Sequence, residues 1–211
     1  MKILLLNGSA LPRGNTFLAL EEIAKTLRAD GIDTEIMQIG TRPVRGCIAC
    51  NQCRSRSPGR CFFDDDLCNR LIERLREADG FVVGSPVYYG QPNGAVLALL
   101  QRAFYAASDA VRGKPAAAVA VCRRGGASAA FQTLQMPFQM LNMPLATSQY
   151  WNIVYGLGPG DAAFDGEGMQ TMRTLAGNLS RLVRALAALP PNAPAENWTP
   201  THFVRDDLKK R

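Results

Sequence analysis

Short runs of strand-forming residues alternate with longer runs of helical periodicity, and this alternation constrains the fold more than any other feature of the chain. Runs typical of buried strands cover residues 2–6, 34–39, 80–84, 116–122 and, roughly, 146–155. Helical spacing of apolar residues marks 15–29, about 64–78, 94–107, about 127–141 and 168–189. Parallel neighbouring strands need helical crossovers. The pattern therefore predicts an α/β fold: a doubly wound, five-stranded parallel sheet with helices on both faces.

The length of 211 residues and an apolar content of 47% suit one such domain with its own core. We expect this domain to span residues 1–189, with a cysteine-rich insertion at about 41–63. A proline-rich tail, 190–211, follows, and its Trp198 and Phe203 are expected to pack on the protein's own or a neighbouring subunit. The apolar run before Asn7, residues 3–6, is only four residues long, too short for a signal peptide, so we expect a soluble, cytoplasmic protein with no membrane contact.

Charge and histidine content exclude several functions. A net charge of +6 favours anionic partners, but it does not by itself imply nucleic acid, and none is expected. The chain has one histidine, His202 in the tail, which excludes a zinc site built on histidines. A Ser/His or Cys/His catalytic pair would need the tail to fold back over the active site.

Ligands of doubly wound sheets bind beyond the carboxyl ends of the strands, where the strand order reverses. Three glycine-rich or turn-rich segments should lie there: 7–16, 85–90 and 122–128. The first follows a strand and opens a helix, which together favour an anion site. It lacks the lysine of a Walker loop and the GxGxxG pattern of dinucleotide sites, so it indicates a terminal monophosphate. The alternative is an ordinary turn in which Asn15 or Thr16 only caps the helix.

The second segment, Gly-Ser-Pro-Val-Tyr-Tyr-Gly from residue 84, places a rigid turn and two aromatic rings at the same edge. A flat, largely apolar ring system needs such walls. Together with the phosphate loop, the cysteine-rich segment and Gly125-Gly126, it makes residues 1–190 resemble the flavodoxin-like NAD(P)H-dependent FMN reductases, specifically the iron–sulfur flavoprotein branch. The resemblance implies a flavodoxin-like strand order of 2-1-3-4-5.

The resemblance also implies a set of FMN-binding residues. Those at the phosphate would be Ser9, Arg13, Gly14, Asn15 and Thr16, and those beside the isoalloxazine Ser85, Pro86, Val87, Tyr88, Tyr89, Gly90, Gly125 and Gly126. Leu11 stands where the family often has arginine, and Arg13 is the nearest candidate to replace it. The flavin would carry the hydride chemistry, so no catalytic side chain is expected.

Two further pairs of side chains have competing interpretations. Arg123 and Arg124 either meet the phosphate of NAD(P)H or are solvated. Tyr88 and Tyr89 either donate hydrogen bonds to a quinone or, more simply, shape the cleft.

Four of the six cysteines follow the pattern Cys47-x2-Cys50-x2-Cys53-x7-Cys61, whose first three positions resemble the start of a bacterial ferredoxin run. In the iron–sulfur flavoproteins such a motif binds a 4Fe-4S cluster. Zinc, or unligated redox-active thiols, are the alternatives. Five nearby arginines should lower the pKa of the thiols and stabilise an anionic cluster: Arg42, Arg45, Arg54, Arg56 and Arg60. Cys68 and Cys122 are expected to be buried, as small apolar side chains are.

These features predict an FMN-dependent oxidoreductase that takes electrons from NAD(P)H or a protein donor and passes them to a quinone, flavin, nitro or azo compound. A non-enzymatic electron carrier is the alternative; the positive charge favours the enzyme, since flavodoxin carriers are strongly acidic. The helix at 94–107 is apolar on most sides, which suggests a subunit interface and hence a homodimer or homotetramer. A redox protein is a further candidate partner.

Overall fold

The computed structural model describes residues 1–190, and the predictions for Trp198, His202 and Phe203 lie outside the described residues. Five strands pair in parallel in the order β2-β1-β3-β5-β6, and the short β4 pairs antiparallel with β3. Their bounds are β1 Lys2–Asn7, β2 Asp33–Gln38, β3 Gly80–Tyr88, β4 Gln91–Pro92, β5 Ala116–Cys122 and β6 Ile153–Tyr155. Counted along the chain, the parallel strands follow the order 2-1-3-4-5, so the predicted fold class is confirmed.

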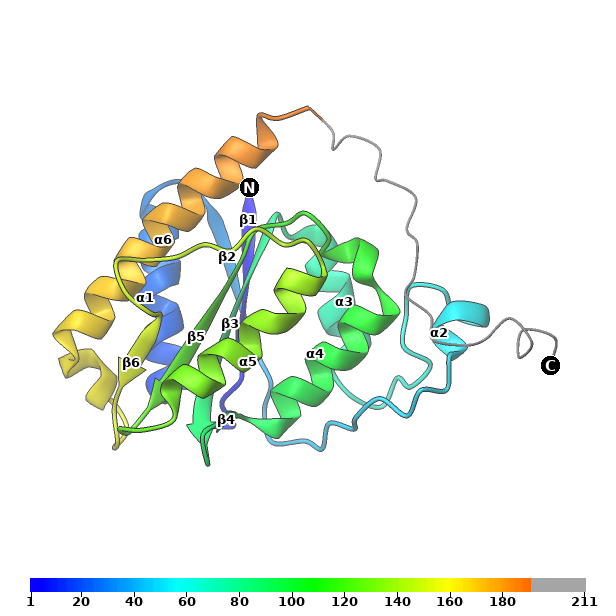
Figure 1. The fold of residues 1–211 in the computed structure, drawn as a ribbon, viewed down its shortest axis with the longest axis horizontal. Helices are drawn as coiled ribbons and strands as arrows, with labels where there is room; N and C mark the ends of the chain where they lie inside the picture. Colours follow the sequence, from blue (N-terminus) through cyan, green and yellow to red (C-terminus); the bar gives the residue numbers. More distant parts are fainter. Residues whose placement is uncertain (191–211) are drawn as a thin grey trace, which may run out of the picture.

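Helices cover both faces of this sheet (Figure 1). One face carries α1 (Asn15–Ala29) and α6 (Gly166–Ala187), and the other carries α3 (Cys68–Glu77), α4 (Gly94–Ala106) and α5 (Ala127–Met140). The four-residue α2 (Gln52–Ser55) lies away from the sheet, beyond α4 in Figure 1. No helix within residues 1–190 has the length and apolar character needed to cross a membrane.

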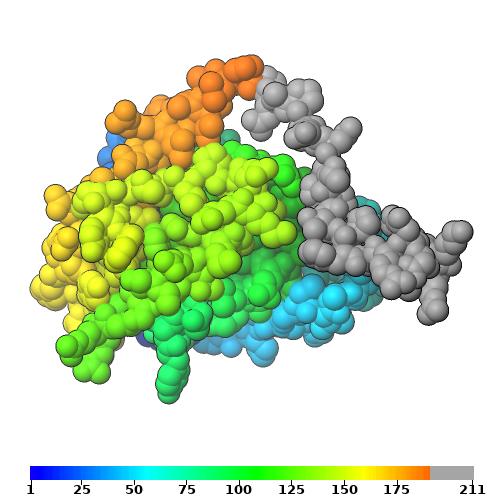
Figure 2. All heavy atoms as spheres, in the orientation of Figure 1, coloured from blue at the N-terminus to red at the C-terminus, as the bar shows by residue number. Residues whose placement is uncertain are grey.

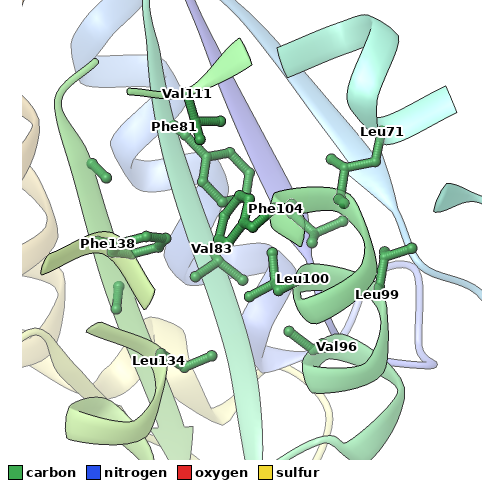
Figure 3. Close-up of a cluster of buried hydrophobic side chains, with 14 of the residues drawn as sticks. Leu71, Phe81, Val83, Val96, Leu99, Leu100, Phe104, Val111, Leu134 and Phe138 are labelled. Carbon is green, nitrogen blue, oxygen red and sulfur yellow. The ribbon is translucent and has the colours of Figure 1, made fainter. Parts of the chain in front are cut away.

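Alternating strand residues feed a core on each face, because successive side chains of a strand point to opposite sides. Strand β1 sends Leu4 and Leu6 to the α3–α4–α5 face and the neighbouring Ile3 and Leu5 to the α1–α6 face. On the first face three phenylalanines, Phe81, Phe104 and Phe138, meet edge to face with ring centroids 6.0–6.3 Å apart (Figure 3). Close packing on both faces holds the strand ends, and hence the loops that leave them, in place.

The apolar side chains of α4 are largely buried by other parts of the same chain. Val96, Leu99, Leu100 and Phe104 are buried in the core on the α3–α4–α5 face. On another side of the helix, the buried Arg102 meets the cysteine-rich segment. The sequence pattern alone therefore does not require a second subunit against this helix.

The prediction that the third strand ends at residue 84 and gives way to a loop is wrong. Strand β3 continues to Tyr88 because Ser85 and Pro86 still pair with β5, and the chain then turns back as a hairpin into β4. Tyr89 and Gly90 form the two-residue turn with φ of 50° and 77°. Positive φ at both positions matches the twist of a hairpin, and a glycine supplies one of them without strain.

The strand predicted at 146–155 is reduced to β6, three residues long. Upstream of it, Ala116 and Leu145 form only an isolated bridge, and the Asn152 side chain donates to the Ala118 carbonyl in place of a ladder bond. Helix α6 begins two residues earlier than predicted because the Asp165 carboxylate accepts from the Gly168 amide and caps it. The cysteine-rich insertion at about 41–63 contains α2.

Candidate functional site

The loops expected to bind a ligand leave the carboxyl edge of the sheet at neighbouring points. Asn7 of β1 pairs with Gly84 of β3, and the strand order reverses between these two strands. The Gly8 amide donates to the Gly84 carbonyl at 2.8 Å, and a Cβ atom on Gly8 would lie only 2.7 Å from that oxygen. A glycine is therefore required where the first loop crosses β3.

The first loop is folded by its own side chains. Asn7 Oδ1 accepts from the Ser9 amide, and Ser9 Oγ accepts from the Leu11 amide at 3.1 Å. Ser9 is 5% exposed, and its hydroxyl keeps one proton to donate. Leu11 and Arg13 are both exposed, so the cation that could replace the family's arginine reaches solvent at the loop.

The N-terminus of α1 leaves amide donors free for a ligand. Gly14 is the N-cap residue in extended conformation, and no side chain caps the helix, so the interpretation of Asn15 or Thr16 as a simple cap is wrong. The first intrahelical bond runs from the Leu18 amide to the Gly14 carbonyl, and the amides before it have no carbonyl one turn earlier. Thr16 is 2% exposed. The arrangement suits a phosphate.

The Asn15 side chain, predicted to contact the phosphate, is held by another loop. Its oxygen accepts from the Gly160 and Ala162 amides, both at 3.1 Å, and its nitrogen donates to the Gly158 carbonyl at 2.8 Å. The segment 156–162, which follows β6, was missed by sequence reasoning. The sequence feature that could have indicated this segment is its three glycines at alternate positions, 156, 158 and 160. In the structure a Cβ atom on Gly156 would lie 2.7 Å from Asn15 Nδ2.

Asn15→Ala should lower the free energy of unfolding by about 2–4 kcal/mol, because three hydrogen bonds between the start of α1 and the segment 156–162 are lost. Asn15→Asp, which keeps both bonds accepted by the side-chain oxygen, should cost less. Urea denaturation of the two variants and the wild type measures the difference. An Asn15→Ala protein as stable as the wild type would show that the contact contributes nothing.

The hairpin and the loop after β5 form a second wall at the same edge. The Gly126 backbone, at φ 84°, packs so closely on Gly90 that a Cβ atom there would lie 2.7 Å from Gly90 Cα. The hairpin projects from the lower edge of the molecule (Figures 1 and 2), with Tyr88 half exposed and Tyr89 fully exposed. In the loop after β5, Arg123, Arg124 and Gly125 are exposed.

Ser85, predicted to border the ring, is fully buried beneath this wall. Its hydroxyl donates to the Pro86 carbonyl and accepts from the Asn93 amide. Asn93, another residue that sequence reasoning missed, caps α4 through the Ala95 amide and donates to the Gly8 carbonyl at 2.8 Å. It therefore ties the first loop to the hairpin.

A second site is formed by the cysteine-rich segment, which runs from the lower edge of the sheet to the side of α4 (Figure 1). All four cysteines of the motif line one pocket, together with aromatic residues and Arg102 of α4: Cys47, Cys50, Cys53 and Cys61. Cys47 and Cys50 are exposed and the other two are half-buried. Within residues 1–190 no three side chains of His, Cys, Asp or Glu are gathered closely enough to hold a metal ion as they stand.

The donor set of this pocket nevertheless suits an iron–sulfur cluster. Its four thiols are accompanied by no carboxylate or imidazole among the residues that line it, and thiolates are the usual ligands of such clusters. Arg102 Nε and Nη2 donate to Cys61 Sγ at 3.4 and 3.2 Å. Hydrogen bonds to sulfur are a recognised way of adjusting such clusters.

The prediction that the arginines lower the pKa of the thiols is wrong at Cys53. Burial raises the pKa of this thiol and outweighs the charge of Arg54. Two of the arginines are also paired with carboxylates, Arg45 with Asp65 and Arg60 with Glu73, which weakens the positive field. Cys68 and Cys122 are buried as predicted, and burial raises the pKa of Cys68 to about 12.

The fold and the loops at the switch point define a flavodoxin-like protein, and comparison with solved structures agrees. A flavodoxin from the domain Archaea superposes with a TM-score of 0.59 at 13% identity, covering 87% of this chain and 99% of that one. A family model described as NADPH-dependent FMN reductase matches residues 1–157. The chain therefore belongs to the NADPH-dependent FMN reductase family.

Two curated relatives are named iron-sulfur flavoproteins. An iron-sulfur flavoprotein of Methanocaldococcus jannaschii is 30% identical over 194 residues, which cover 88% of this chain and 99% of the relative. An iron-sulfur flavoprotein of Archaeoglobus fulgidus is 30% identical over 162 residues, which cover 71% of this chain and 78% of the relative. The predicted resemblance is confirmed.

Proposed function

We propose that this chain is an FMN-dependent oxidoreductase that takes electrons from NAD(P)H or a protein donor and passes them to a small acceptor. The acceptor classes we propose are quinones, flavins and nitro or azo compounds. The observation that carries the proposal is that the uncapped N-terminus of α1 and the wall formed by Gly90 and Gly126 lie at the same edge of the sheet. Membership of the reductase family supports the cofactor.

In this proposal the chain's own residues bind and orient the cofactor, and bound FMN supplies the hydride and electron chemistry. The first-turn amides of α1 and the Thr16 hydroxyl donate to the phosphate. The hairpin turn at Tyr89-Gly90 and the loop at Gly125-Gly126 border the isoalloxazine. Asn15 and Ser85 act indirectly, since each hydrogen-bonds to protein groups that support these loops.

The cysteine pocket is proposed to hold a 4Fe-4S cluster through Cys47, Cys50, Cys53 and Cys61. Two observations support this: the four thiols line one pocket, and the relatives are named iron-sulfur flavoproteins. Cluster and flavin sites occupy separate segments, so loss of one should leave the other intact.

An electron carrier that works without NAD(P)H is the second candidate, and steady-state kinetics separates the two. The enzyme should oxidise NADH or NADPH continuously when a quinone is supplied, and the exposed Arg123 and Arg124 would meet the phosphates of the reductant. A flavin that is reduced chemically, that neither nicotinamide reduces, and that passes electrons only to a redox protein would favour the carrier.

We further propose a homodimer or homotetramer. Large exposed apolar side chains occur on α5 and in the segment that follows it: Met136, Met140, Tyr150, Trp151 and Tyr155. Met136 and Met140 stand one helical turn apart on α5, and the rings of Tyr150 and Trp151 lie 5.2 Å apart. Exposed apolar groups of this kind favour a partner. Sedimentation equilibrium at micromolar concentration should give a mass of at least twice 22.9 kDa. A mass equal to one chain would contradict this.

A further inference from the structure

Cys61 is held from two sides, unlike the other three cysteines of the pocket. Its backbone amide donates to Asn69 Oδ1 at 2.8 Å, and its carbonyl accepts from Asn69 Nδ2 at 3.0 Å. Its sulfur accepts from Arg102. Asn69 belongs to α3 and Arg102 to α4, both packed on the sheet, so the rigid core fixes Cys61 at the main chain and at the sulfur.

Arg102 is a buried cation whose guanidinium bonds to the Asp66 carboxylate, to Cys61 Sγ and to the carbonyls of Arg45 and Phe63. Its side chain is 1% exposed, and Nη1 bonds to the Asp66 carboxylate, which is 4% exposed. The other edge of the guanidinium, Nε and Nη2, faces Cys61 Sγ. The ion pair with Asp66 uses Nη1, and the Phe63 carbonyl accepts from Nη2 at 3.4 Å, so neither contact explains the bond from Nε to Cys61 Sγ. A neutral thiol is a weak acceptor, whereas a metal-bound thiolate is an electron-rich one.

Among the described residues, the two N–H hydrogen bonds to a cysteine sulfur both come from Arg102 and both reach Cys61. Cys47 and Cys50 are exposed, and Cys53 lies in the short α2. Cys61 is therefore the thiol of the pocket that side chains of the packed core hold in place. Groups that orient a metal ligand from behind typically change metal affinity by about 10- to 100-fold when removed.

We propose that Arg102 is the positioning residue of the cysteine pocket, holding Cys61 Sγ in place as a cluster ligand. It also sets the reduction potential of the cluster through its two N–H bonds to that sulfur. This rests on the cluster proposed above. Because donors to sulfur stabilise the more negative, reduced state, Arg102 raises the potential.

The test compares variants of the full chain prepared and reconstituted anaerobically with iron and sulfide. Arg102→Lys keeps the charge but has one nitrogen to share between Asp66 and Cys61. Arg102→Met alone would leave the Asp66 carboxylate buried without its partner, and loss of folding could hide the effect. The double variant Arg102→Met/Asp66→Asn removes both charges and keeps the oxygen that accepts from the Cys68 amide.

The matched control is Arg54→Lys, in the same segment. Arg54 stacks over Tyr105, with Cζ 4.8 Å from the ring centroid, and it makes no hydrogen bond to a cysteine sulfur among the described residues. FMN content and thermal unfolding establish that each variant is folded. The readouts are iron and sulfide per chain, the rate of iron release to a chelator, and the cluster's reduction potential from an anaerobic titration followed by EPR.

Both Arg102 variants should bind iron about 10- to 100-fold more weakly and have a lower potential, whereas Arg54→Lys should match the wild type. A folded, FMN-containing double variant with wild-type iron retention and potential would overturn the proposal. Wild-type protein that carries FMN but no iron or sulfide would instead reject the proposed cluster, and the role of Arg102 with it. The two failures are therefore distinguishable.

Discussion

Gly126→Ala is expected to weaken FMN binding about tenfold or more. The residue has φ of 84°, and its new Cβ atom would lie 2.7 Å from Gly90 Cα, a backbone atom that can move only if the hairpin moves. Strain of this kind costs about 1–3 kcal/mol. The variant relieves this strain by displacing the hairpin. Because FMN must reverse the displacement to bind, the free energy of the strain is subtracted from that of binding. A loss of 1.4 kcal/mol corresponds to about tenfold weaker affinity.

The neighbouring glycine provides the control for this experiment. A Cβ atom on Gly125 would meet no atom within 4 Å, and its φ is not positive. Titration of apoprotein with FMN, followed by flavin fluorescence, should give a smaller loss of affinity for Gly125→Ala than for Gly126→Ala. Equal affinities of the two variants would show that the wall formed by Gly90 and Gly126 does not border the cofactor.

Cys50→Ser is expected to remove most of the iron from anaerobically prepared protein while FMN remains bound. Cys50 is exposed, so the substitution leaves the core intact, whereas a cluster deprived of one of four thiolates loses a ligand. Cys122→Ala is the matched control, since this buried cysteine ends β5 and does not line the pocket. Iron and sulfide assays and the flavin absorption measure both outcomes.

Unchanged iron in Cys50→Ser would show that this thiol is not a ligand. Simultaneous loss of iron and FMN would contradict the separation of the two sites. In the structure the phosphate loop and the hairpin lie at the carboxyl edge, whereas the cysteine pocket lies against α4.

Most strands and helices were predictable because they depend on patterns that are local in sequence, whereas the strand order came from the family resemblance. Buried runs such as Ala116–Cys122 and the amphipathic α1 are each contained in one short segment. The extension of β3 to Tyr88 was not predictable, because its later residues form a strand only through pairing with β5 and β4. The polar segment before β6 likewise turns away from the ladder through the Asn152 side chain.

The candidate site was predictable as a set of loops but not as a set of contacts. Glycines 8, 90 and 126 stand out in the sequence, and the structure shows close backbone approaches at them that the sequence did not predict. The partners of Asn15 lie more than 140 positions away, and those of Arg102 include a sulfur 41 positions away, so no local pattern reveals them. Arg102 itself stands in a largely apolar helix, where a lone arginine resembles a surface residue until packing shows it to be buried.

Anaerobic purification followed by chromatographic identification of the released flavin, with iron and sulfide assays on the same sample, tests the central claim most directly. The account predicts FMN, with about four irons and four sulfides per chain. FAD, or no flavin, would contradict the monophosphate site at the N-terminus of α1. Iron-free protein that still carries FMN and reduces acceptors at full rate would contradict the cluster.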